Sequence, residues 1–431
     1  MALRFPNPAL LCLYFIGGAT VGLAQSHPSE NWIATWATAQ QLAPTTPEVP
    51  ALAPGVKMPD FGAMKGPKPS HVEPKIADHQ TIRMIVHTSV GGRTLRVELA
   101  NAFGHETVSI GSARVALRTT GSSVDLHSDR QLTFSGSKTF DLPPGVVLVS
   151  DPVDLTIQPM SDLAVSLLVV KGGSSPTNHM IGLHTSYLAD GDQTGHDTLT
   201  KSSTTTSYVW LRSVDVVASN RDFAIACLGD SITDGYGTTN DANQAWPTLL
   251  AKRLASQGTG PHISVLNEGI SGNEVLRDGA GASALARLDR DVFSEPGVRW
   301  IVLLEGINDI NLHGQITGPE GLAADDLIRG YKQIIARAHM HHVKIAGATL
   351  TTEEGVWLAG SVGEATRETV NQWIRSSGAF DTVIDFDAIV RDKDHPAKIR
   401  EDLDPGDHIH PNDRGNAAMA DALPLSTFIE Q

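Results

Sequence analysis

The stretch FAIACLGDSITDG, residues 223–235, decides how the second half of this chain folds. It begins with six apolar residues and passes at once into Gly-Asp-Ser. An uninterrupted apolar run of this length, ended by a turn signal, is typical of a strand buried on both faces of a parallel sheet. A helix candidate follows over residues 242–256. Ser231 is therefore expected at a tight strand-to-helix turn.

The same alternation of apolar runs and helical stretches continues toward the C-terminus. Four more strand candidates lie over residues 263–266, 300–304, 343–348 and 382–386. Further helix candidates lie over residues 282–292, 322–342, 362–376 and 412–423. Strands that alternate with helices predict an α/β domain over residues 221–431, with a doubly wound, flavodoxin-like parallel sheet covered on both faces. Ligands of such sheets bind at the carboxyl ends of the strands.

The preceding part of the chain has a period of two instead. Within one segment, Leu95, Val97 and Leu99 alternate with polar residues, as in a half-buried strand. Similar segments lie over residues 81–87, 113–118, 146–149 and 163–170. Several short strands with turn signals between them predict an antiparallel β-sandwich domain over residues 25–220.

A proline-rich segment interrupts this first domain. Residues 41–75 hold 8 of the 24 prolines of the chain. Regular secondary structure is excluded there, because proline fixes φ and lacks the backbone N–H. The segment is either a disordered connector or a long ordered loop, and long loops are often functional.

Residues 1–24 have the pattern of a signal peptide. Arg4 is the only charged residue before Glu30, a short apolar run follows it, and small residues lead to Ala24. This pattern predicts cleavage after about Ala24 and a secreted or periplasmic protein. No run reaches the roughly 20 apolar residues that a membrane span needs. Cys227 would be the only cysteine after cleavage, so no intramolecular disulfide is expected.

The composition is that of a globular protein. The 431 residues include 41% hydrophobic and 19% charged residues, which excludes collagen and wholesale disorder. Lys and Arg number 33 against 48 Asp and Glu, a formal net charge of −15. Most of the surface would repel phosphates, so binding to nucleic acid or to an anionic membrane is not expected.

Three of the predicted strands are followed by polar or small residues that could take part in a reaction. Ser231 is either a nucleophile at a turn or the N-cap of a helix. Asn308, in Gly-Ile-Asn-Asp, can aim an amide N–H at a developing oxyanion or cap its own turn. Gly272 can offer a backbone N–H at the same edge of the sheet, but alone it marks only a turn.

A segment near the C-terminus adds histidines and carboxylates. His410 can act as a general base, because imidazole ordinarily titrates near neutral pH. Asp407, three residues earlier, can hold one ring nitrogen while the other faces the serine. His408 competes for this role on spacing alone. Together with Asp404, these residues can also be interpreted as metal ligands.

Taken together, four segments resemble the four blocks for which the GDSL/SGNH hydrolase family is named. They are GDSITDG with Ser231, NEGISGN with Gly272, GIND with Asn308, and DHIH with Asp407 and His410. Their order and approximate spacing fit the family over residues 222–431. The first block has Ile where the family name has Leu. No Gly-x-Ser-x-Gly elbow surrounds Ser231, so the chain does not resemble an ordinary α/β-hydrolase.

The resemblance implies ester hydrolysis through a covalent acyl-enzyme, which makes the chain a carboxylic ester hydrolase. Ser231 would be the nucleophile, His410 the general base and Asp407 the residue that orients the base. The resemblance also implies that no metal ion and no organic cofactor takes part.

The oxyanion would be held by the backbone N–H groups of Ser231 and Gly272 and by the amide of Asn308. Asp230 and Asp309 would support their turns rather than react. Trp357 follows a strand end and is a candidate for stacking against a substrate sugar, although burial in the core is the usual fate of tryptophan.

The front half resembles, less specifically, the β-rich extension of secreted bacterial GDSL/SGNH hydrolases. The segments concerned are residues 32–38, 89–92 and 101–104. The resemblance implies a secreted serine esterase that acts on short acyl groups, with O-acetyl esters of carbohydrate as the expected substrate.

A lipase, phospholipase or arylesterase, an acyltransferase and a non-catalytic glycan-binding protein stay open as alternatives. The expected partner is an acylated small molecule or polysaccharide, and the sequence does not determine the oligomeric state. We expect the β-rich domain to lie beside the active site and shape access to it.

Overall fold

The computed structural model describes residues 30–41, 76–173, 175–258, 260–317, 322–356 and 360–429, with side chains except at 313–317 and 361. The predicted signal peptide and the proline-rich segment from residue 42 onward lie outside the described residues. In the part of the chain that is described, none of the helices is long and apolar enough to cross a membrane.

The first part of the chain forms antiparallel sheets. One sheet has the order β1-β14-β3-β7, and β8 also pairs with β3. These strands are β1 (Asn31–Ala37), β14 (Leu211–Ala218), β3 (Gly92–Ala100), β7 (Val147–Val149) and β8 (Val153–Ile157).

A second antiparallel sheet has the order β12-β11-β2-β9-β4-β5, and β6 also pairs with β4. Its strands are β12 (Ser203–Thr205), β11 (Ser186–Asp190), β2 (Gln80–His87), β9 (Asp162–Lys171), β4 (Val108–Leu117), β5 (Arg130–Gln131) and β6 (Phe140–Leu142). A separate ribbon pairs β10 (Asn178–His179) with β13 (Tyr208–Val209).

The two larger sheets share one hydrophobic core. Val97 and Val214 of the first sheet lie in the same buried cluster as Met84 and Val165 of the second. Burying the apolar side chains of alternate residues from two sheets is what defines a β-sandwich. The predicted β-rich sandwich is therefore confirmed.

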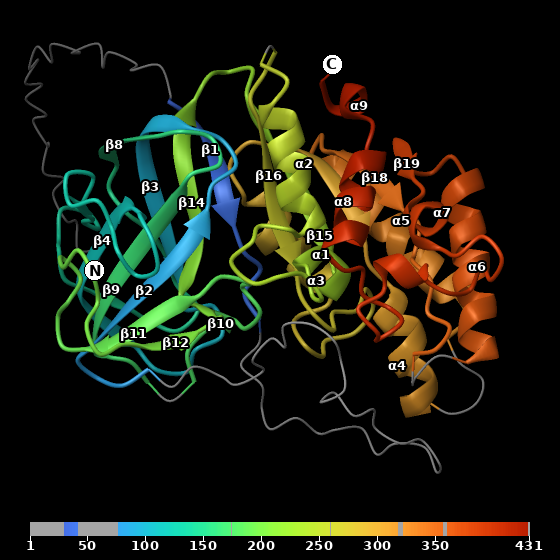
Figure 1. The fold of residues 1–431 in the computed structure, drawn as a ribbon, viewed down its shortest axis with the longest axis horizontal. Coiled ribbons are helices and arrows are strands. Elements are labelled where there is room, and N and C mark those ends of the chain that lie inside the picture. Colours follow the sequence, from blue (N-terminus) through green and yellow to red (C-terminus); the bar gives the residue numbers. More distant parts are fainter. Residues whose placement is uncertain are drawn as a thin grey trace, which may run out of the picture. The chain divides into compact units, whose positions relative to one another are not determined.

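The second part contains a five-stranded parallel sheet of order β16-β15-β17-β18-β19 (Figure 1). Its strands are β15 (Phe223–Gly229), β16 (Ile263–Gly269), β17 (Val298–Leu304), β18 (Lys344–Ala348) and β19 (Thr382–Ile384). The helices are α1 (Ser231–Asp234), α2 (Trp246–Ala255), α3 (Ala284–Leu288), α4 (Ile307–Thr317), α5 (Ala324–Met340), α6 (Ser361–Ser376), α7 (Phe386–Val390), α8 (Asp413–Ala422) and α9 (Leu425–Ile429).

Helices cover both faces of this parallel sheet. Ile225 and Cys227 belong to a core that includes residues of α2 and α8. Ala226 and Leu228, which alternate with them along β15, belong to the core that includes residues of α5 and α6. Successive side chains of a strand point to opposite faces, so the apolar run of β15 serves two cores. The predicted doubly wound, flavodoxin-like sheet is confirmed.

Three predicted elements are wrong in detail. The helix expected over residues 242–256 begins only at Trp246. The helix expected over residues 282–292 is α3 followed by a π-helical turn, Asp289–Phe293. The strand expected over residues 382–386 ends at Ile384. It ends there because the Asp385 side chain accepts a hydrogen bond from the Ala388 backbone N–H and so caps α7.

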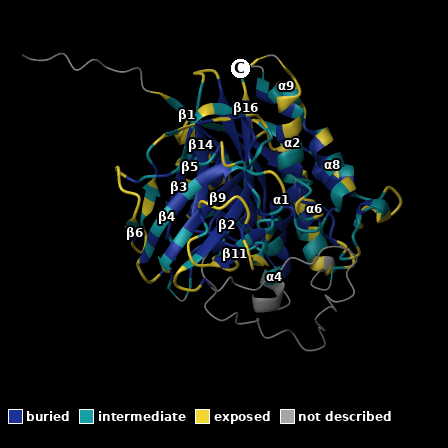
Figure 2. Cartoon of the chain, turned by 60° about the vertical axis from the view of Figure 1, so that its left-hand side comes forward, coloured by how far each residue is buried: buried dark blue, intermediate teal, exposed yellow. Residues whose placement is uncertain are grey.

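The sandwich and the parallel sheet meet along one edge. Ala34 in β1 donates its backbone N–H to Pro296 O at 3.0 Å, and Thr38 forms a parallel bridge with Asn267 of β16. Figure 2 shows that the strands are mostly buried, whereas exposed residues lie on loops and outer helix faces. The described residues from Asn31 onward pack as one compact unit. A boundary between separately folding domains near residue 220 stays a prediction.

Candidate active site

The carboxyl ends of three parallel strands meet at one edge of the sheet. Gly229 at the end of β15 lies in register with Gly269 of β16 and with Leu304 of β17. Each of these ends leads within a few residues into one of the polar segments that the sequence singled out. The sheet thereby brings the segments of Ser231, Gly272 and Asn308 to the same edge.

The side chain of Ser231 lies against His410, although 179 residues separate them in sequence. Ser231 Oγ is 2.8 Å from His410 Nε2, and His410 Nδ1 is 2.6 Å from Asp407 Oδ2. Ser231 is largely buried, with 7% of its surface exposed, and the His410 side chain is 15% exposed. The ring of Tyr236 lies 4.3 Å from the His410 ring, centroid to centroid. These contacts place a hydroxyl, an imidazole and a carboxylate in one line of hydrogen bonds.

Asp407 also shapes its own loop. Its Oδ1 accepts backbone N–H groups from Ile409 at 3.1 Å and His410 at 3.0 Å. Burial alone would raise the pKa of Asp407, but hydrogen bonding and the charge of His410 outweigh burial and lower it. The carboxylate is thus ionised under ordinary conditions. It holds Nδ1 of His410 as the protonated nitrogen, so Nε2 is free to accept the Ser231 proton.

His408 has a separate partner. Its Nδ1 lies 2.7 Å from Asp404 Oδ2, and its backbone adopts a left-handed conformation with φ of 68°. The His408 side chain is half exposed. The spacing alone left His408 and His410 in competition, and the structure places only His410 within hydrogen-bond distance of Ser231.

The groups expected at the oxyanion are brought to the same edge. Within the described residues, neither the Ser231 nor the Gly272 backbone N–H donates a hydrogen bond. Gly272 has φ of 82°, which favours glycine. Asn308 uses one amide N–H to bind Asn273 O at 2.9 Å, and this bond ties its side chain to the loop that contains Gly272.

Asp230 and Asp309 contact backbone, as supporting residues would. Asp230 accepts the Ile232 N–H at 2.9 Å and is the N-cap of α1. Asp309 accepts the N–H groups of Val275 at 2.7 Å and Leu276 at 3.0 Å. Burial raises the pKa of Asp230 to about 6 and that of Asp309 to about 7. Both carboxylates hold loops beside the expected site.

Arg287 is a residue at this edge that sequence reasoning missed. Its fully buried guanidinium donates to Gly229 O at 2.9 Å, Glu268 O at 2.7 Å and Asn273 Oδ1 at 2.9 Å. It therefore joins the ends of β15 and β16 to the Gly272 loop. In sequence it is one arginine within a helix candidate, where an exposed position is the usual expectation.

Asp234 is the second residue that was missed, although it lies inside the block GDSITDG. Its Oδ2 accepts both the backbone N–H of Ser271 at 3.1 Å and the Ser271 hydroxyl at 2.7 Å. Its Oδ1 lies 3.2 Å from His179 Nε2 in the β-rich part. Gly269 permits this close approach, because a Cβ there would lie 2.2 Å from the Asp234 backbone nitrogen.

The sequence also offered Trp357 as a candidate for stacking against a sugar and, as an alternative interpretation, a metal site near the C-terminus. Trp357 lies outside the described residues. Within the described part of the chain, no group of three or more His, Cys, Asp or Glu side chains is arranged to hold a metal ion.

One known family matches the part of the chain that contains this site. Residues 227–418 match the model of the GDSL-like Lipase/Acylhydrolase family. The match includes Ser231, Gly272, Asn308, Asp407 and His410. Residues 227–418 therefore form a GDSL-like lipase/acylhydrolase domain. The protein is a carboxylic ester hydrolase.

The similarity of this chain to solved esterase structures is low. An acetyl xylan esterase is 23% identical with a TM-score of 0.35, covering 46% of this chain and 97% of its own. The esterase EstA from Pseudoalteromonas sp. is 18% identical with a TM-score of 0.36, covering 48% and 99%. A family two carbohydrate esterase from Cellvibrio japonicus is 14% identical with a TM-score of 0.35, covering 81% and 89%. No curated protein matches. Neither substrate nor mechanism follows from likeness of this degree.

Proposed function

We propose that the protein is a secreted serine esterase that hydrolyses short acyl esters, O-acetyl groups on carbohydrate above all, through an acyl-enzyme on Ser231. The observation that carries this proposal is the hydrogen-bonded line from Ser231 Oγ through His410 to Asp407, at 2.8 Å and 2.6 Å. This is the arrangement of nucleophile, base and orienting acid that activates a serine hydroxyl.

Acylation starts when His410 Nε2 takes the proton of Ser231 as Oγ attacks the ester carbonyl. Asp407 stabilises the imidazolium that forms. His410 then gives this proton to the departing alcohol, so the C–O bond of the ester breaks and the acyl group stays on Ser231. A water molecule, deprotonated by His410 in the same way, releases the acid and restores the serine.

The negative charge on the carbonyl oxygen needs donors in place before the reaction. The proposed donors are the amide of Asn308 and the backbone N–H groups of Ser231 and Gly272, which donate to none of the described residues. One side-chain amide of this kind contributes about 3 kcal/mol to a transition state. No step calls for a metal ion or an organic cofactor.

The surface of the described residues supports a polar substrate with a short acyl group. The large apolar side chains that are strongly exposed there are Leu126, Val147, Val149, Met340 and Val362. None of them belongs to the segments that carry the proposed catalytic residues. The residue two positions before His410 is polar: His408 is half exposed, and its imidazole contacts the Asp404 carboxylate.

A longer acyl chain is the second candidate, on one specific observation. A groove of about 400 Å³ lies beside Asp309 and is lined in part by Leu276, Leu285 and Leu322. Its lining does not include Ser231 or His410. An enzyme that binds a long acyl chain there would be a lipase.

A chain-length series separates these candidates. The enzyme and Ser231→Ala are assayed with p-nitrophenyl esters of two to sixteen carbons, and then with acetylated polysaccharides. A maximum at acetate that is lost in Ser231→Ala is the expected result, and a maximum at long chains favours the second candidate. Full activity in Ser231→Ala would refute the acyl-enzyme. N-terminal sequencing of protein exported by the cell tests the proposed cleavage after Ala24.

A further inference from the structure

A carboxylate links the helix of Ser231 to the residue before Gly272. Asp234 ends α1, three residues after Ser231, and is 4% exposed. It binds both the backbone N–H and the hydroxyl of Ser271, at 3.1 Å and 2.7 Å. The position of the Gly272 N–H therefore depends on where the Asp234 carboxylate is held.

The β-rich part supplies the partner that holds this carboxylate. His179, in β10, places Nε2 at 3.2 Å from Asp234 Oδ1 and Nδ1 at 2.7 Å from Ala39 O. A carbonyl oxygen only accepts, so Nδ1 carries a proton. Nε2 must carry one as well, because a lone pair there would face the carboxylate oxygen. The contact is thus between an imidazolium and a carboxylate.

The charge balance around His179 agrees with this protonation. Burial opposes the charged form, but the nearby Asp234 carboxylate outweighs burial and raises the pKa of His179. A buried pair of this kind becomes costly when one partner is removed, because the other charge is then left without compensation.

A second contact from the β-rich part reaches the same loop from its other end. Gln41 is held beside β10, since it donates its backbone N–H to Asn178 O at 2.8 Å and accepts the Met180 N–H at 2.8 Å. Its Nε2 donates to Ala280 O at 3.0 Å. Ala280 packs directly on Gly272, because a Cβ on Gly272 would lie 2.9 Å from the Ala280 Cβ.

We propose that His179 is a positioning residue of the esterase site, which through Asp234 holds the Ser271–Gly272 loop where the Gly272 N–H meets the oxyanion. The inference rests on the proposed function in assigning that N–H to the oxyanion. It gives the β-rich part a role in catalysis itself, beyond shaping access to the site.

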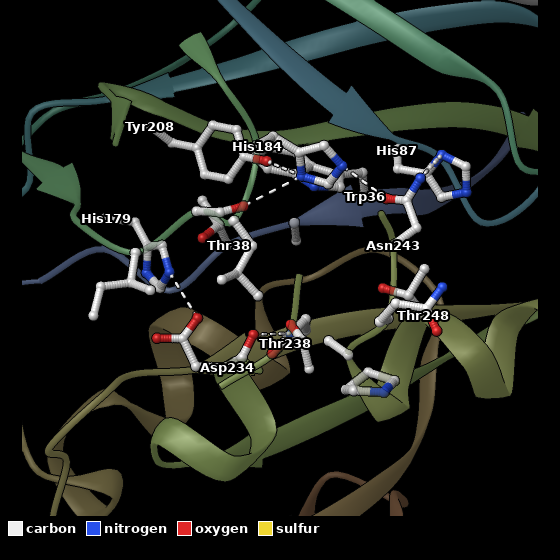
Figure 3. A pocket seen from close by; sticks show the side chains of 18 of the residues that line it. Trp36, Thr38, His87, His179, His184, Tyr208, Asp234, Thr238, Asn243 and Thr248 are labelled. Atoms are coloured by element: carbon white, nitrogen blue, oxygen red, sulfur yellow. Dashed lines mark hydrogen bonds and ion pairs between the residues drawn. The ribbon is translucent and has the colours of Figure 1, made fainter. Parts of the chain in front are cut away.

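The structure offers a matched control in the same place. His179 lines a cavity of about 70 Å³ between β-rich and α/β residues, and His184 lines it too (Figure 3). His184 is also buried, and its ring nitrogens lie 2.7 Å from Asn243 Oδ1 and 3.0 Å from the Tyr208 hydroxyl. Among the described residues, no hydrogen bond or ion pair joins it to Asp234. His184→Ala therefore loosens the same interface without touching the carboxylate that holds the loop.

The kinetic test compares His179→Ala with His184→Ala in the full chain, using p-nitrophenyl acetate. For His179→Ala we expect kcat to fall about 10- to 100-fold with KM changed less than about threefold, because oxyanion binding acts in the transition state. For His184→Ala we expect both constants within about threefold of the parent enzyme. Added imidazole should restore part of kcat in His179→Ala, because the substitution leaves a space the size of the deleted ring. Ser231→Ala is the blank for imidazole's own reaction with the ester.

A second readout does not depend on turnover. Amide hydrogen exchange over residues 269–280 should be several-fold faster in His179→Ala than in the parent enzyme, and unchanged in His184→Ala. This result would stand even if the ester chosen were not a substrate, so failure of the proposed function is distinguished from failure of the positioning role.

Two outcomes would overturn the inference. One is a His179→Ala enzyme with kcat and exchange equal to the parent. The other is an equal loss in both histidine variants, which would indicate a general weakening of the interface. If His179→Ala does not fold, His179→Gln takes its place: its amide keeps a donor toward Asp234 without the charge, so an intermediate loss of kcat is expected.

Discussion

Replacing Asp407 by Asn tests the proposed mechanism at its most specific contact. Oδ1 of Asp407 accepts two backbone N–H groups, from Ile409 and His410, while Oδ2 lies 2.6 Å from His410 Nδ1. In Asp407→Asn the amide oxygen is needed for the two backbone donors. The amide NH₂ then faces Nδ1, which must become an acceptor, so the proton of the neutral imidazole moves to Nε2. A protonated Nε2 facing Ser231 Oγ cannot take the serine proton.

The expected loss is large in kcat and small in binding. An imidazole held in the wrong tautomer lowers turnover about 1,000- to 10,000-fold in triads of this kind. At about 1.4 kcal/mol per factor of ten, that is about 4 to 5.5 kcal/mol of activation free energy. KM should change less than about threefold, because no atom of Asp407 is proposed to touch the substrate. The loop keeps its two backbone hydrogen bonds, so we expect a cost of about 1 kcal/mol in folding stability.

The assay is steady-state hydrolysis of p-nitrophenyl acetate, with a urea denaturation curve for each variant. Asp404→Asn is the matched control, since Asp404 binds His408 at 2.7 Å in the same segment but has no place in the proposed triad. It should keep kcat within about threefold. If a folded Asp407→Asn enzyme kept more than a tenth of the activity, Asp407 would not set the tautomer of His410. An equal loss in Asp404→Asn would contradict the prediction as well.

Three further predictions follow from particular contacts. Asn308→Ala should lower kcat about 100- to 1,000-fold with KM nearly unchanged in the same assay, and a pure KM effect would remove Asn308 from the oxyanion site. Burial raises the pKa of Glu353 to about 7 in the folded protein, which is above its value in the unfolded chain. Protonated Glu353 therefore contributes to the free energy of unfolding in full below about pH 4.5, and this contribution is lost as the pH rises through 7. Glu353→Gln should therefore match the parent in urea unfolding at pH 4.5 and exceed it by at most about 3 kcal/mol at pH 8, whereas a deficit at pH 8 would contradict this. Gly269→Ala should cost more than about 2 kcal/mol of unfolding free energy, because its Cβ would lie 2.2 Å from the Asp234 nitrogen, whereas Gly360→Ala, with open space around it, should change stability by less than about 1 kcal/mol.

Much of the fold could be predicted from local pattern. The run from Phe223 to Leu228 is apolar at every position because both faces of β15 are covered, and the alternation of Leu95, Val97 and Leu99 reflects one buried face of β3. The end of β19 could not be placed in the same way. Ile384 and Phe386 are both buried, but the Asp385 cap turns the chain into a helix between them.

The site residues that lie in short sequence motifs could be predicted from the sequence. The four segments could be recognised one by one, and their common location follows once a parallel sheet is inferred, because such strands end at one edge. The choice between His408 and His410 could not be made from spacing, since each has an aspartate within four residues. It depends on which ring lies beside Ser231.

Periodicity, turn chemistry and short motifs were enough to predict the five strands of the parallel sheet, most of the longer helices around it and the residue types that gather at its edge. The burial of Arg287 among the strand ends, and the contact of His179 in the β-rich part with Asp234 of α1, could be seen only in the folded chain. The reason is physical. A hydrogen bond or ion pair between residues 55 positions apart leaves no trace in local periodicity. It forms only when the β-rich part and the α/β part pack together and exclude water from the charged groups between them.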